Sequence, residues 1–500
     1  MNKRISTIDN RFVDDKGNHL ILHGINMVCK DKTRNYNFSW NFEDFDKLSD
    51  WGFNVIRLGI IWDGIEPELG KYDSSYLKKL DQLIENAKEN NIYVFLDMHQ
   101  DLFSVIFSDG APEWATLTNG TEHVDGEIWS DAYFMSPAVQ KSFDSFWNNE
   151  KAKDGKGIQT HYIEMWKMIA DRYKQEPYVI GYDLMNEPFM GSTSNLFMHS
   201  ILNQLKNNIN DSDNSVNLTE AEMSKMWLES DTRLTLLKEY SDSNSYADLI
   251  DVTEDLLKKF DKEILMPFYN DITKAIREVD TESLIFFETN YLGNLGIFTG
   301  LDPIIDENKN RVNNQVYAPH GYDILTDTKH MKDANLKRIK LIFDRHFKTS
   351  LRLRMPLMIG EWGAYQSNDG LEEQSLYTAS LFEKYLCSDT YWCFDKKIDF
   401  EKQSFFEGIH RSYPMSIAGI IQNYHNTQTS FHCVWIEQDS RGQESLFYIK
   451  DLKSIDTQNI VLEPISDVLF IKNQNNDSGY IKIQSIGENS FRTLDIKKIT

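Results

Sequence analysis

The segment YVIGYDLMNE (178–187) carries the pattern that decides the fold, an apolar run of strand length that ends in Asn186 and Glu187. Short apolar runs bounded by polar segments are typical of parallel strands that helices cover. Seven more runs of this kind lie in the first four hundred residues, at 19–27, 53–60, 92–99, 283–290, 315–321, 356–363 and 390–394. Eight such runs that alternate with polar segments of helix length predict a (β/α)8 barrel, the TIM barrel of the α/β class.

The segments between the runs show the apolar spacing of amphipathic helices. Four of them are clear, at 74–91, 161–175, 267–280 and 336–347. Asp73 and Ser74 stand where the first of these helices needs an N-cap. The chain therefore has the crossover helices that parallel strands require.

Two connections are much longer than the ~2 to 6 residues usual between a barrel strand and its helix. They span about 102–157 and about 189–262. Both follow the carboxyl end of a strand, which is the face where barrel active sites lie. Their apolar clusters, at 103–107 and 196–205, leave two interpretations open: a small satellite core in each insertion, or a lid that lines an apolar acceptor site.

From about residue 426 the pattern changes to short alternating segments separated by Asn, Asp and Gly turns. Examples are SFHCVWIEQ (430–438) and SGYIKIQSI (478–486). Alternation with period two predicts antiparallel strands with one buried face. We therefore expect a catalytic barrel domain at 1–425 and a small C-terminal β-sandwich domain at 426–500.

The composition excludes several kinds of partner. Asp and Glu outnumber Lys and Arg by 77 to 53, so the surface repels phosphate backbones and anionic bilayers, and nucleic acid is excluded as a partner. The four cysteines have neither metal-ligand nor redox spacing, and no motif indicates a cofactor. No apolar run approaches the ~18 residues of a membrane span, and the N-terminus lacks the apolar core of a secretory signal. We therefore expect a soluble protein, secreted if a leader has been removed and otherwise cytoplasmic, of undetermined oligomeric state.

Glu187 and Glu361 are the two carboxylates best placed for chemistry. Glu187 ends the fourth predicted strand, and Glu361 occupies the matching place on the seventh, across the barrel. Hydrolysis of a glycosidic bond needs two carboxyl groups that flank one bond, and a separation of ~5 to 5.5 Å leads to a covalent intermediate and retention. Most acidic residues are solvated surface charges, but a glutamate buried in an apolar strand end is tolerated chiefly where it is used or paired.

Further polar residues lie at other strand ends and are candidates for substrate binding: Arg57, His99, Asp101, Asn186, His320, Tyr322 and Trp392. A single residue of this kind is more often a satisfied core group, but seven on five strand ends indicate a site. His99, Asp101 and His320 could also be metal ligands, because barrel hydrolases place His and Asp at strand ends. The two histidines stand singly on distant strands without H-x-H pairing, so we expect no metal.

Seven motifs, in this order, resemble the retaining glycosidases of glycoside hydrolase family 5 over roughly residues 11–425: HGIN (23–26), NVIRLG (54–59), LDMHQD (96–101), DLMNEP (183–188), APHGYD (318–323), IGEWG (359–363) and YW (391–392). Within that family, HGINMVCKD (23–31), HQDLFSVIFSDGAPEWA (99–115) and RSYPMSIAG (411–419) are similar to endoglycoceramidases. Those enzymes cut the β-glucosidic bond between an intact glycan and ceramide, and they carry a β-sandwich beside the barrel. The resemblance implies a glycolipid or β-glucoside substrate, no cofactor, and transient contact with lipid surfaces or micelles.

For the two glutamates, the resemblance implies that Glu187 is the acid/base and Glu361 the nucleophile. An acid that works at neutral pH needs a raised pKa, which the negative charge of Glu361 would supply. Once Glu361 is glycosylated that repulsion ends, and Glu187 can act as a base.

The resemblance also implies roles for the other matched residues. Asn186 hydrogen-bonds the sugar 2-hydroxyl, Tyr322 orients the nucleophile, and Arg57 and His320 hold the charged groups. The residues expected to contact the sugars are Lys30, Asp101, Trp147 and Trp392, with Trp392 as the platform beneath the ring at the cleavage site.

Three other activities stay open. A glucosidase for glucosylceramide, sterol glucosides or other small β-glucosides would use the same carboxylates if one insertion closed the sugar end. An endo-β-glucanase is disfavoured because its open cleft does not need apolar loops, and a non-catalytic glycolipid binder because both carboxylates and Asn186 are present. At the position of Gly321, endoglycoceramidases more often have Phe. At the position of Trp362, many family members have Phe. These residues neighbour the site, so the preferred glycan stays open.

Overall fold

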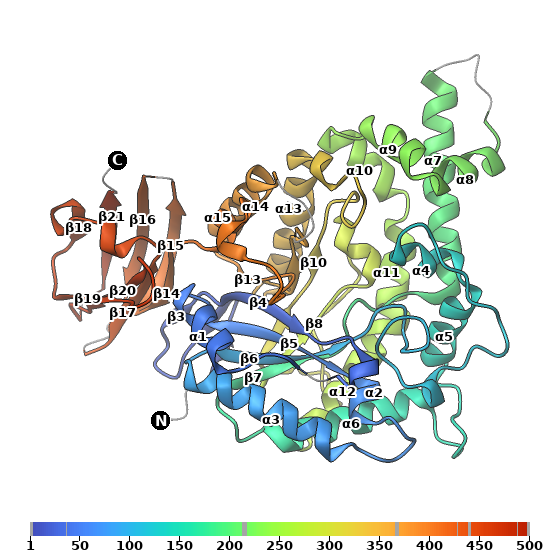
Figure 1. Cartoon of the computed structure of the whole chain (residues 1–500), viewed down its shortest axis with the longest axis horizontal. Helices are drawn as coiled ribbons and strands as arrows, with labels where there is room; N and C mark the ends of the chain where they lie inside the picture. Colours follow the sequence, from blue (N-terminus) through green and yellow to red (C-terminus); the bar gives the residue numbers. More distant parts are fainter. Residues whose placement is uncertain are drawn as a thin grey trace.

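The structure is a computed structural model that describes residues 4–36, 38–212, 218–365, 370–427, 429–438, 442–487 and 489–497. At its centre, eight parallel strands follow the order β11-β13-β4-β5-β6-β7-β8-β9 (Figure 1). They are β4 (His23–Val28), β5 (Val55–Ile61), β6 (Tyr93–His99), β7 (Val179–Asp183), β8 (Leu284–Phe287), β9 (Gln315–Tyr317), β11 (Met358–Ile359) and β13 (Ser388–Tyr391). Tyr317 bridges Leu357, and β10 (His320–Gly321) pairs with β12 (Glu361–Trp362), so the two ends of the sheet meet. Each predicted run overlaps one of these strands, and the predicted TIM barrel is confirmed.

The barrel strands are buried along their length. All seven residues of β5 and all five of β7 are buried, as expected where side chains fill the barrel and helices cover it. Three charged residues interrupt β5, β6 and β7: Arg57, Asp97 and Asp183. A buried charge is tolerated only with partners, and these three side chains contact one another.

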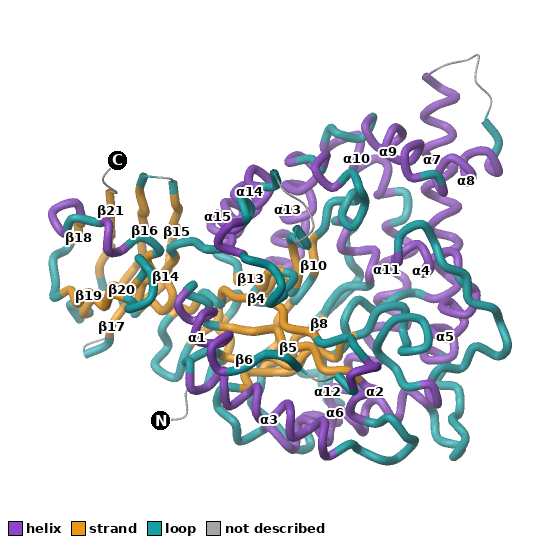
Figure 2. The backbone as a smooth tube through the Cα atoms, viewed as in Figure 1, coloured by secondary structure: helices purple, strands orange, loops and turns teal. Residues whose placement is uncertain are grey.

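Helices cover the outside of the barrel (Figure 1 and Figure 2). They include α1 (Phe42–Asp50), α2 (Trp62–Ile65), α3 (Ser74–Glu89), α6 (Ile158–Tyr173), α12 (Met266–Arg277), α13 (Leu336–Leu353), α14 (Glu372–Tyr385) and α15 (Phe406–Ile409). Asp73 is the N-cap of α3, because its side chain accepts hydrogen bonds from the backbone N–H groups of Ser75 and Tyr76 at 2.7 and 3.2 Å. None of the helices in the described ranges is both long enough and apolar enough to cross a bilayer.

The two long insertions are largely helical. The first contains η2 (Glu113–Ala115), η3 (Trp129–Asp131), α4 (Ala132–Met135) and α5 (Pro137–Trp147). The second contains η4 (Gly191–Thr193), α7 (Ser194–Ser212), α8 (Glu220–Leu228), α9 (Ser230–Lys238), α10 (Ser243–Asp251) and α11 (Glu254–Phe260), and it leads through η5 (Asp261–Leu265) into α12. Figure 1 shows both insertions on the side of the barrel away from the C-terminal strands.

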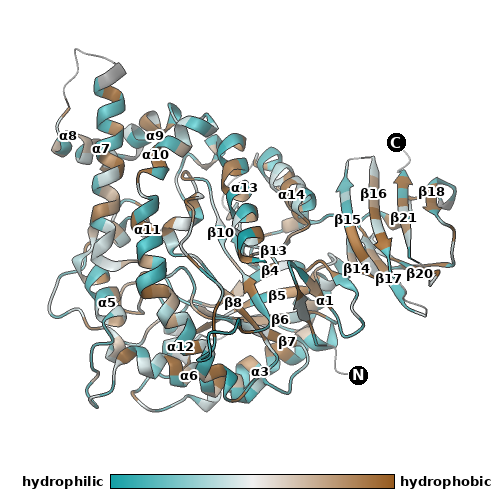
Figure 3. Ribbon diagram, turned by 180° about the vertical axis from the view of Figure 1, so that it is seen from behind, coloured by the Kyte–Doolittle hydropathy of each residue, from teal (hydrophilic) through white to brown (hydrophobic). Residues whose placement is uncertain are grey.

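Two antiparallel sheets lie at the other side of the barrel. One has the order β1-β2-β3-β14-β17-β20-β19 and the other β15-β16-β21-β18. Their strands are β1 (Ser6–Ile8), β2 (Arg11–Val13), β3 (His19–Leu20), β14 (Tyr413–Ile417), β15 (Gly419–Asn426), β16 (Ser430–Glu437), β17 (Glu444–Ile449), β18 (Ile460–Glu463), β19 (Val468–Lys472), β20 (Gly479–Gln484) and β21 (Ser490–Lys497). Figure 3 shows hydrophobic residues along these strands, and a core that includes Phe431, Trp435 and Phe447 joins the sheets.

The first sheet also contains strands from the N-terminus. Leu20 of β3 pairs with Ser416 of β14, so this sheet draws on both ends of the chain. The alternating pattern noted from residue 426 does not reveal β1 to β3 or β14. The first three strands pair with one another near the N-terminus, and β3 joins β14 across about four hundred positions.

Candidate active site

Glu187 and Glu361 come together at the carboxyl ends of the barrel strands. Glu187 follows β7 and Glu361 begins β12, and both side chains are nearly buried. A carboxylate oxygen of each and a ring nitrogen of His320 all lie within 4.8 Å of one another. His320 Nδ1 is 2.9 Å from Glu187 Oε1 and 3.5 Å from Glu361 Oε2. Two carboxyl groups this close can act on the same bond.

Arg57 fixes one oxygen of Glu361. Its Nη1 donates a hydrogen bond to Glu361 Oε1 at 2.7 Å and another to Asn26 Oδ1 at 3.2 Å. Its Nη2 donates to Asn186 Oδ1 at 2.9 Å, and Asn186 Nδ2 donates to the carbonyl of Gln100 at 3.0 Å. The planar guanidinium thus orients Glu361.

Three buried carboxylates that sequence reasoning did not select surround the same guanidinium. Arg57 Nη2 lies 2.8 Å from Glu288 and 2.9 Å from Asp97, and Nε lies 2.9 Å from Asp183. We call Arg57, Asp97, Asp183, Glu288 and Glu361 the charged cluster. Burial, opposed by the charge of Arg57, raises the pKa of Asp97 and of Asp183 to about 6, and burial with repulsion from Asp183 raises the pKa of Glu288 well above its usual range. An acidic residue inside or at the end of an apolar strand is the signal that could have found all three.

The backbone of Glu187 lies in the left-handed region, with φ 44°. Its N–H donates to Glu288 Oε2 at 3.0 Å, and Gln100 Nε2 donates to its carbonyl at 3.1 Å. This conformation is unfavourable for a residue with a Cβ and persists where surrounding contacts enforce it, most often at functional sites. The bonds from Glu288 and Gln100 therefore direct the Glu187 side chain.

Burial is the main cause of a high pKa at Glu187. It raises the pKa to about 7, repulsion from Glu361 and Asp101 adds to the shift, and the hydrogen bond with His320 opposes it. The expected repulsion from Glu361 is present, but loss of hydration is the larger contribution to the raised pKa of Glu187. Glu187 is thus suited to carry a proton near neutral pH.

Tyr322 and Asn294 complete the contacts of the two glutamates. The Tyr322 hydroxyl donates to Glu361 Oε2 at 2.9 Å, as expected for a residue that orients Glu361. Asn294 Nδ2 donates to Glu187 Oε1 at 2.7 Å. Asn294 lies in η6 (Tyr291–Leu295), in a segment without strand or helix periodicity, so nothing in the sequence pointed to it.

Lys30, His99, Asp101 and Trp392 form a second polar group beside the same site. Lys30 Nζ forms an ion pair with Asp101 and lies 4.7 Å from the centre of the Trp392 ring. The His99 ring stacks on Trp392 with 5.2 Å between ring centres and 12° between planes. The structure thus brings together these four residues as the sequence predicted, around an indole that can serve as a sugar platform.

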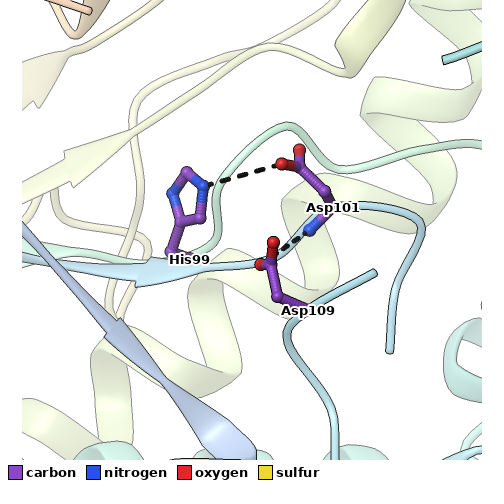
Figure 4. Close-up of side chains that lie close together, drawn as sticks. All are labelled: His99, Asp101 and Asp109. Carbon is purple, nitrogen blue, oxygen red and sulfur yellow. Dashed lines mark hydrogen bonds and ion pairs between the residues drawn. The ribbon is translucent and has the colours of Figure 1, made fainter. Parts of the chain in front are cut away.

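Among the residues that the structure describes, three groups of side chains bring potential metal-ligand atoms within 4.8 Å of one another: His99, Asp101 and Asp109; Glu187, His320 and Glu361; and Asp97, Asp183 and Glu288. Figure 4 shows the first group, in which the Asp101 backbone N–H donates to Asp109 at 3.1 Å. The Lys30 ammonium pairs with Asp101 and lies 3.8 Å from Asp109, and Arg57 lies among the third group. A metal ion at either place would have to displace a cationic side chain.

A cavity of about 420 Å³ adjoins Glu187, Asn186 and Glu361. Apolar residues of both insertions form part of its lining, which we call the insertion wall: Ile128, Trp129, Phe134, Phe197, Met198, Ile201, Trp227, Leu249 and Ile250. Buried residues of the insertions belong to the same hydrophobic cluster as the barrel core. The insertions therefore extend the barrel core and line the cavity with apolar side chains, as the lid interpretation expected.

Trp147 lies apart from the other expected sugar contacts. Its indole N–H donates to the carbonyl of Phe189 at 2.8 Å, and its ring packs edge-on against Phe146, Phe260 and Phe268. It is not among the residues that line the cavity. Trp147 thus stands away from the cavity lining, where it braces the two insertions against each other.

Curated proteins with similar sequences include endoglycoceramidases. The endoglycoceramidase of Hydra vulgaris is 29% identical over 308 residues, which cover 56% of this chain and 48% of that protein. The endoglycoceramidase of Cyanea nozakii is 32% identical over 210 residues, which cover 36% of this chain and 41% of that protein. The chain spans about half the length, or less, of these relatives.

The fold is shared with solved structures along nearly the whole chain. Endo-glycoceramidase II from Rhodococcus sp. has a TM-score of 0.72 at 21% identity, with 98% of this chain and 99% of that chain covered. Sterylglucosidase 1 of Cryptococcus neoformans has a TM-score of 0.68 at 15% identity, with 100% and 97% covered. The sequence profile of the cellulase family matches residues 13–398, a range that holds all the barrel strands and both glutamates. The chain belongs to this family, glycosyl hydrolase family 5.

Proposed function

We propose that this chain is a retaining β-glycosidase that cuts the β-glucosidic bond between the glycan and the ceramide of a glycosphingolipid. Glu361 is the nucleophile and Glu187 the acid/base. The observation that carries the proposal is the approach of the two carboxylates within 4.8 Å, near the ~5 to 5.5 Å typical of retaining glycosidases. Their different surroundings support the division of roles, because Arg57 and Tyr322 donate hydrogen bonds to Glu361, whereas burial raises the pKa of Glu187 to about 7.

In the first half of the reaction, Glu361 attacks the anomeric carbon while Glu187 gives its proton to the glycosidic oxygen. The bond between carbon and that oxygen breaks, its electron pair stays with the oxygen, and ceramide leaves as the alcohol. The glycan is then held as an ester on Glu361. Asn294 already donates to Glu187 Oε1, so the transferable proton sits on Oε2.

In the second half, a water molecule attacks the anomeric carbon and Glu187 takes its proton. The ester bond breaks, and Glu361 returns as a carboxylate. While the ester exists, the negative charge that repels the ionised form of Glu187 is gone, so the pKa of Glu187 falls and the base form is favoured. Two inversions at the same carbon give overall retention.

The cavity supports a glycolipid substrate. The polar group of Lys30, Asp101 and Trp392 suits a sugar, and the insertion wall suits acyl chains. The curated relatives named endoglycoceramidase, and a ganglioside GM3 complex of the endo-glycoceramidase II from Rhodococcus sp., add weight to this substrate class.

The proposal is tested with lactosylceramide in detergent micelles. We expect equal amounts of lactose and ceramide, detected by mass spectrometry, and no product with Glu361→Gln. Stepwise release of galactose and then glucose would contradict cleavage at the ceramide bond. Release of glucose from glucosylceramide, without action on lactosylceramide, would favour the alternative of a glucosidase for small β-glucosides.

The assignment of the two glutamates has its own test. Glu187→Gln with an activated aryl β-lactoside should form the glycosyl-enzyme, because a good leaving group needs no acid, but should hydrolyse it slowly without the base. Mass spectrometry of the digested protein should then place one lactosyl group on the peptide with Glu361. An adduct elsewhere would contradict the assignment.

A further inference from the structure

We propose that Asn294 selects the aglycone: its Oδ1 accepts a hydrogen bond from an N–H or O–H group of the lipid next to the glycosidic oxygen, while its Nδ2 supports Glu187. This inference rests on the proposed function and narrows its substrate class. It favours aglycones such as ceramide, which carry an amide N–H on the carbon beside the glycosylated CH2 group. Sterols and simple alkyl chains have no donor at that place.

The two ends of the Asn294 amide are not equivalent. Nδ2 donates to Glu187 Oε1 at 2.7 Å. The amide oxygen could not take its place when Glu187 is in its base form, because an ionised carboxylate only accepts. Oδ1 is buried, and within the residues that the structure describes it has no hydrogen-bond partner. The side chain is 5% exposed and lines the cavity. Buried amide oxygens are normally paired, so an unpaired one at a cavity indicates a place for a donor from a ligand.

Contacts of η6 hold the backbone of Asn294 in place beside Glu187. Asn290 caps the helical turn η6, because its Oδ1 accepts from the Leu292 N–H at 3.1 Å and its Nδ2 donates to buried Asp261 at 2.7 Å. The Tyr322 N–H donates to the carbonyl of Asn294 at 3.4 Å. The contacts on both sides of the residue fix its backbone.

The surroundings place Asn294 on the aglycone side. The general acid faces the leaving group, and Asn294 is bonded to that acid. The sugar candidates Lys30 and Trp392 belong to a different group of contacts. Leu295, the neighbour of Asn294 in η6, lines the cavity, and its carbonyl accepts from Tyr246 of α10, a helix that contributes to the insertion wall.

The test compares two lipids with the same lactose and with two long hydrocarbon chains each. One is lactosylceramide, and the other is a lactosyl diacylglycerol, which has no donor beside the glycosylated carbon. For the wild type we expect kcat/KM in mixed micelles to favour lactosylceramide by about tenfold, the effect of one lost hydrogen bond to a buried group. In Asn294→Leu the ratio should fall to about one. Any damage to Glu187 lowers both rates alike and cancels in the ratio.

Two further variants make the comparison robust. Asn294→Ala removes the same amide with less crowding and should also give a ratio near one. Leu295→Ala changes the adjacent apolar contact and should keep the wild-type ratio. If both Asn294 variants lose the preference for lactosylceramide and Leu295→Ala keeps it, the loss cannot be assigned to general damage of η6.

The outcomes separate this inference from the proposed function. If the wild type cleaves both lipids equally, or if Asn294→Leu keeps the wild-type ratio, the role of Asn294 is overturned while glycolipid hydrolysis stands. If the wild type cleaves neither lipid but hydrolyses an aryl β-lactoside, the proposed substrate class fails and the inference fails with it.

Discussion

The charged cluster, which reaches the cavity through Glu361, and the insertion wall adjoin the same cavity but are held by different forces. The charged cluster stands within the barrel strands or just after them, and its hydrogen bonds and ion pairs are almost wholly buried. The insertion wall consists of apolar side chains. Polar contacts such as that between Arg233 and Asp131 join the two insertions that carry it. The difference indicates that the strands fix the chemistry, whereas the insertions set which lipid is accepted.

Replacing the nucleophile should cause the largest change, a loss of kcat without loss of lipid binding. Glu361→Gln keeps the shape of the side chain but cannot form the ester, so kcat for lactosylceramide should fall by at least about 10⁴-fold. Binding of the lipid to the insertion wall should persist, and it can be measured by equilibrium binding of labelled lactosylceramide.

The matched control is Glu68→Gln, an exposed glutamate whose side chain pairs only with Lys71. It should keep wild-type kcat. A Glu361→Gln variant that retains more than about one per cent of the wild-type rate would contradict the assignment of the nucleophile.

The second largest effect concerns stability. Arg57→Met leaves the buried carboxylates of the charged cluster without their cation, and it should lower the free energy of unfolding by about 3 to 5 kcal/mol. Urea unfolding of the variant at neutral pH measures this loss. The folded fraction should also lose kcat, because Glu361 is no longer oriented.

Arg492→Met is the matched control. Arg492 is equally buried but pairs with Glu437 at 2.5 Å between strands of the C-terminal sheets. Its loss should also destabilise the protein, yet the folded fraction should keep its kcat. If both variants lose kcat alike, the effect of Arg57 is one of general stability.

The third effect is the pH dependence of the acid. Glu187 must be protonated for the first half of the reaction, and its pKa is raised to about 7, so kcat/KM for lactosylceramide should fall about tenfold per pH unit above that value. A carboxyl with an ordinary pKa would lose activity above about pH 4.5 instead. An activated aryl β-lactoside should lack this alkaline loss, because its leaving group needs no proton. A midpoint below about pH 5.5 for lactosylceramide would contradict the shift.

The fold could be predicted from the sequence because its signals are local. Eight short apolar runs separated by helical segments already specify the barrel, and Glu187 and Glu361 interrupt that pattern visibly. The pairing of β3 with β14 could not be predicted, because neither strand shows in its own sequence which distant strand it joins.

The site was predictable in part for the same reason. Residues toward the carboxyl ends of strands, such as Arg57 and Tyr322, were found because the barrel places the carboxyl ends of all its strands on one face. Glu288 carries the same signal and was overlooked, whereas Asn294 lies in a loop whose course depends on tertiary contacts with Asn290 and Asp261. Trp147, an aromatic residue that the resemblance matches to a sugar contact, packs between helices and is not among the residues that line the cavity.

The smallest effect is expected at the insertion wall. Arg233 of α9 donates to Asp131 of η3 at 3.1 Å, with side chains 10% and 14% exposed, so this ion pair ties the second insertion to the first. Arg233→Met and Asp131→Asn should each raise KM for lactosylceramide a few-fold, and the double variant should be no worse than either, which corresponds to a coupling free energy of about 1 kcal/mol. Steady-state kinetics of the four proteins gives this value, and Lys71→Met, which breaks an exposed pair, is the control. If kcat for an aryl β-lactoside falls by the same factor by which KM for lactosylceramide rises, the insertions act on the chemistry as well. The division between strands and insertions would then not hold.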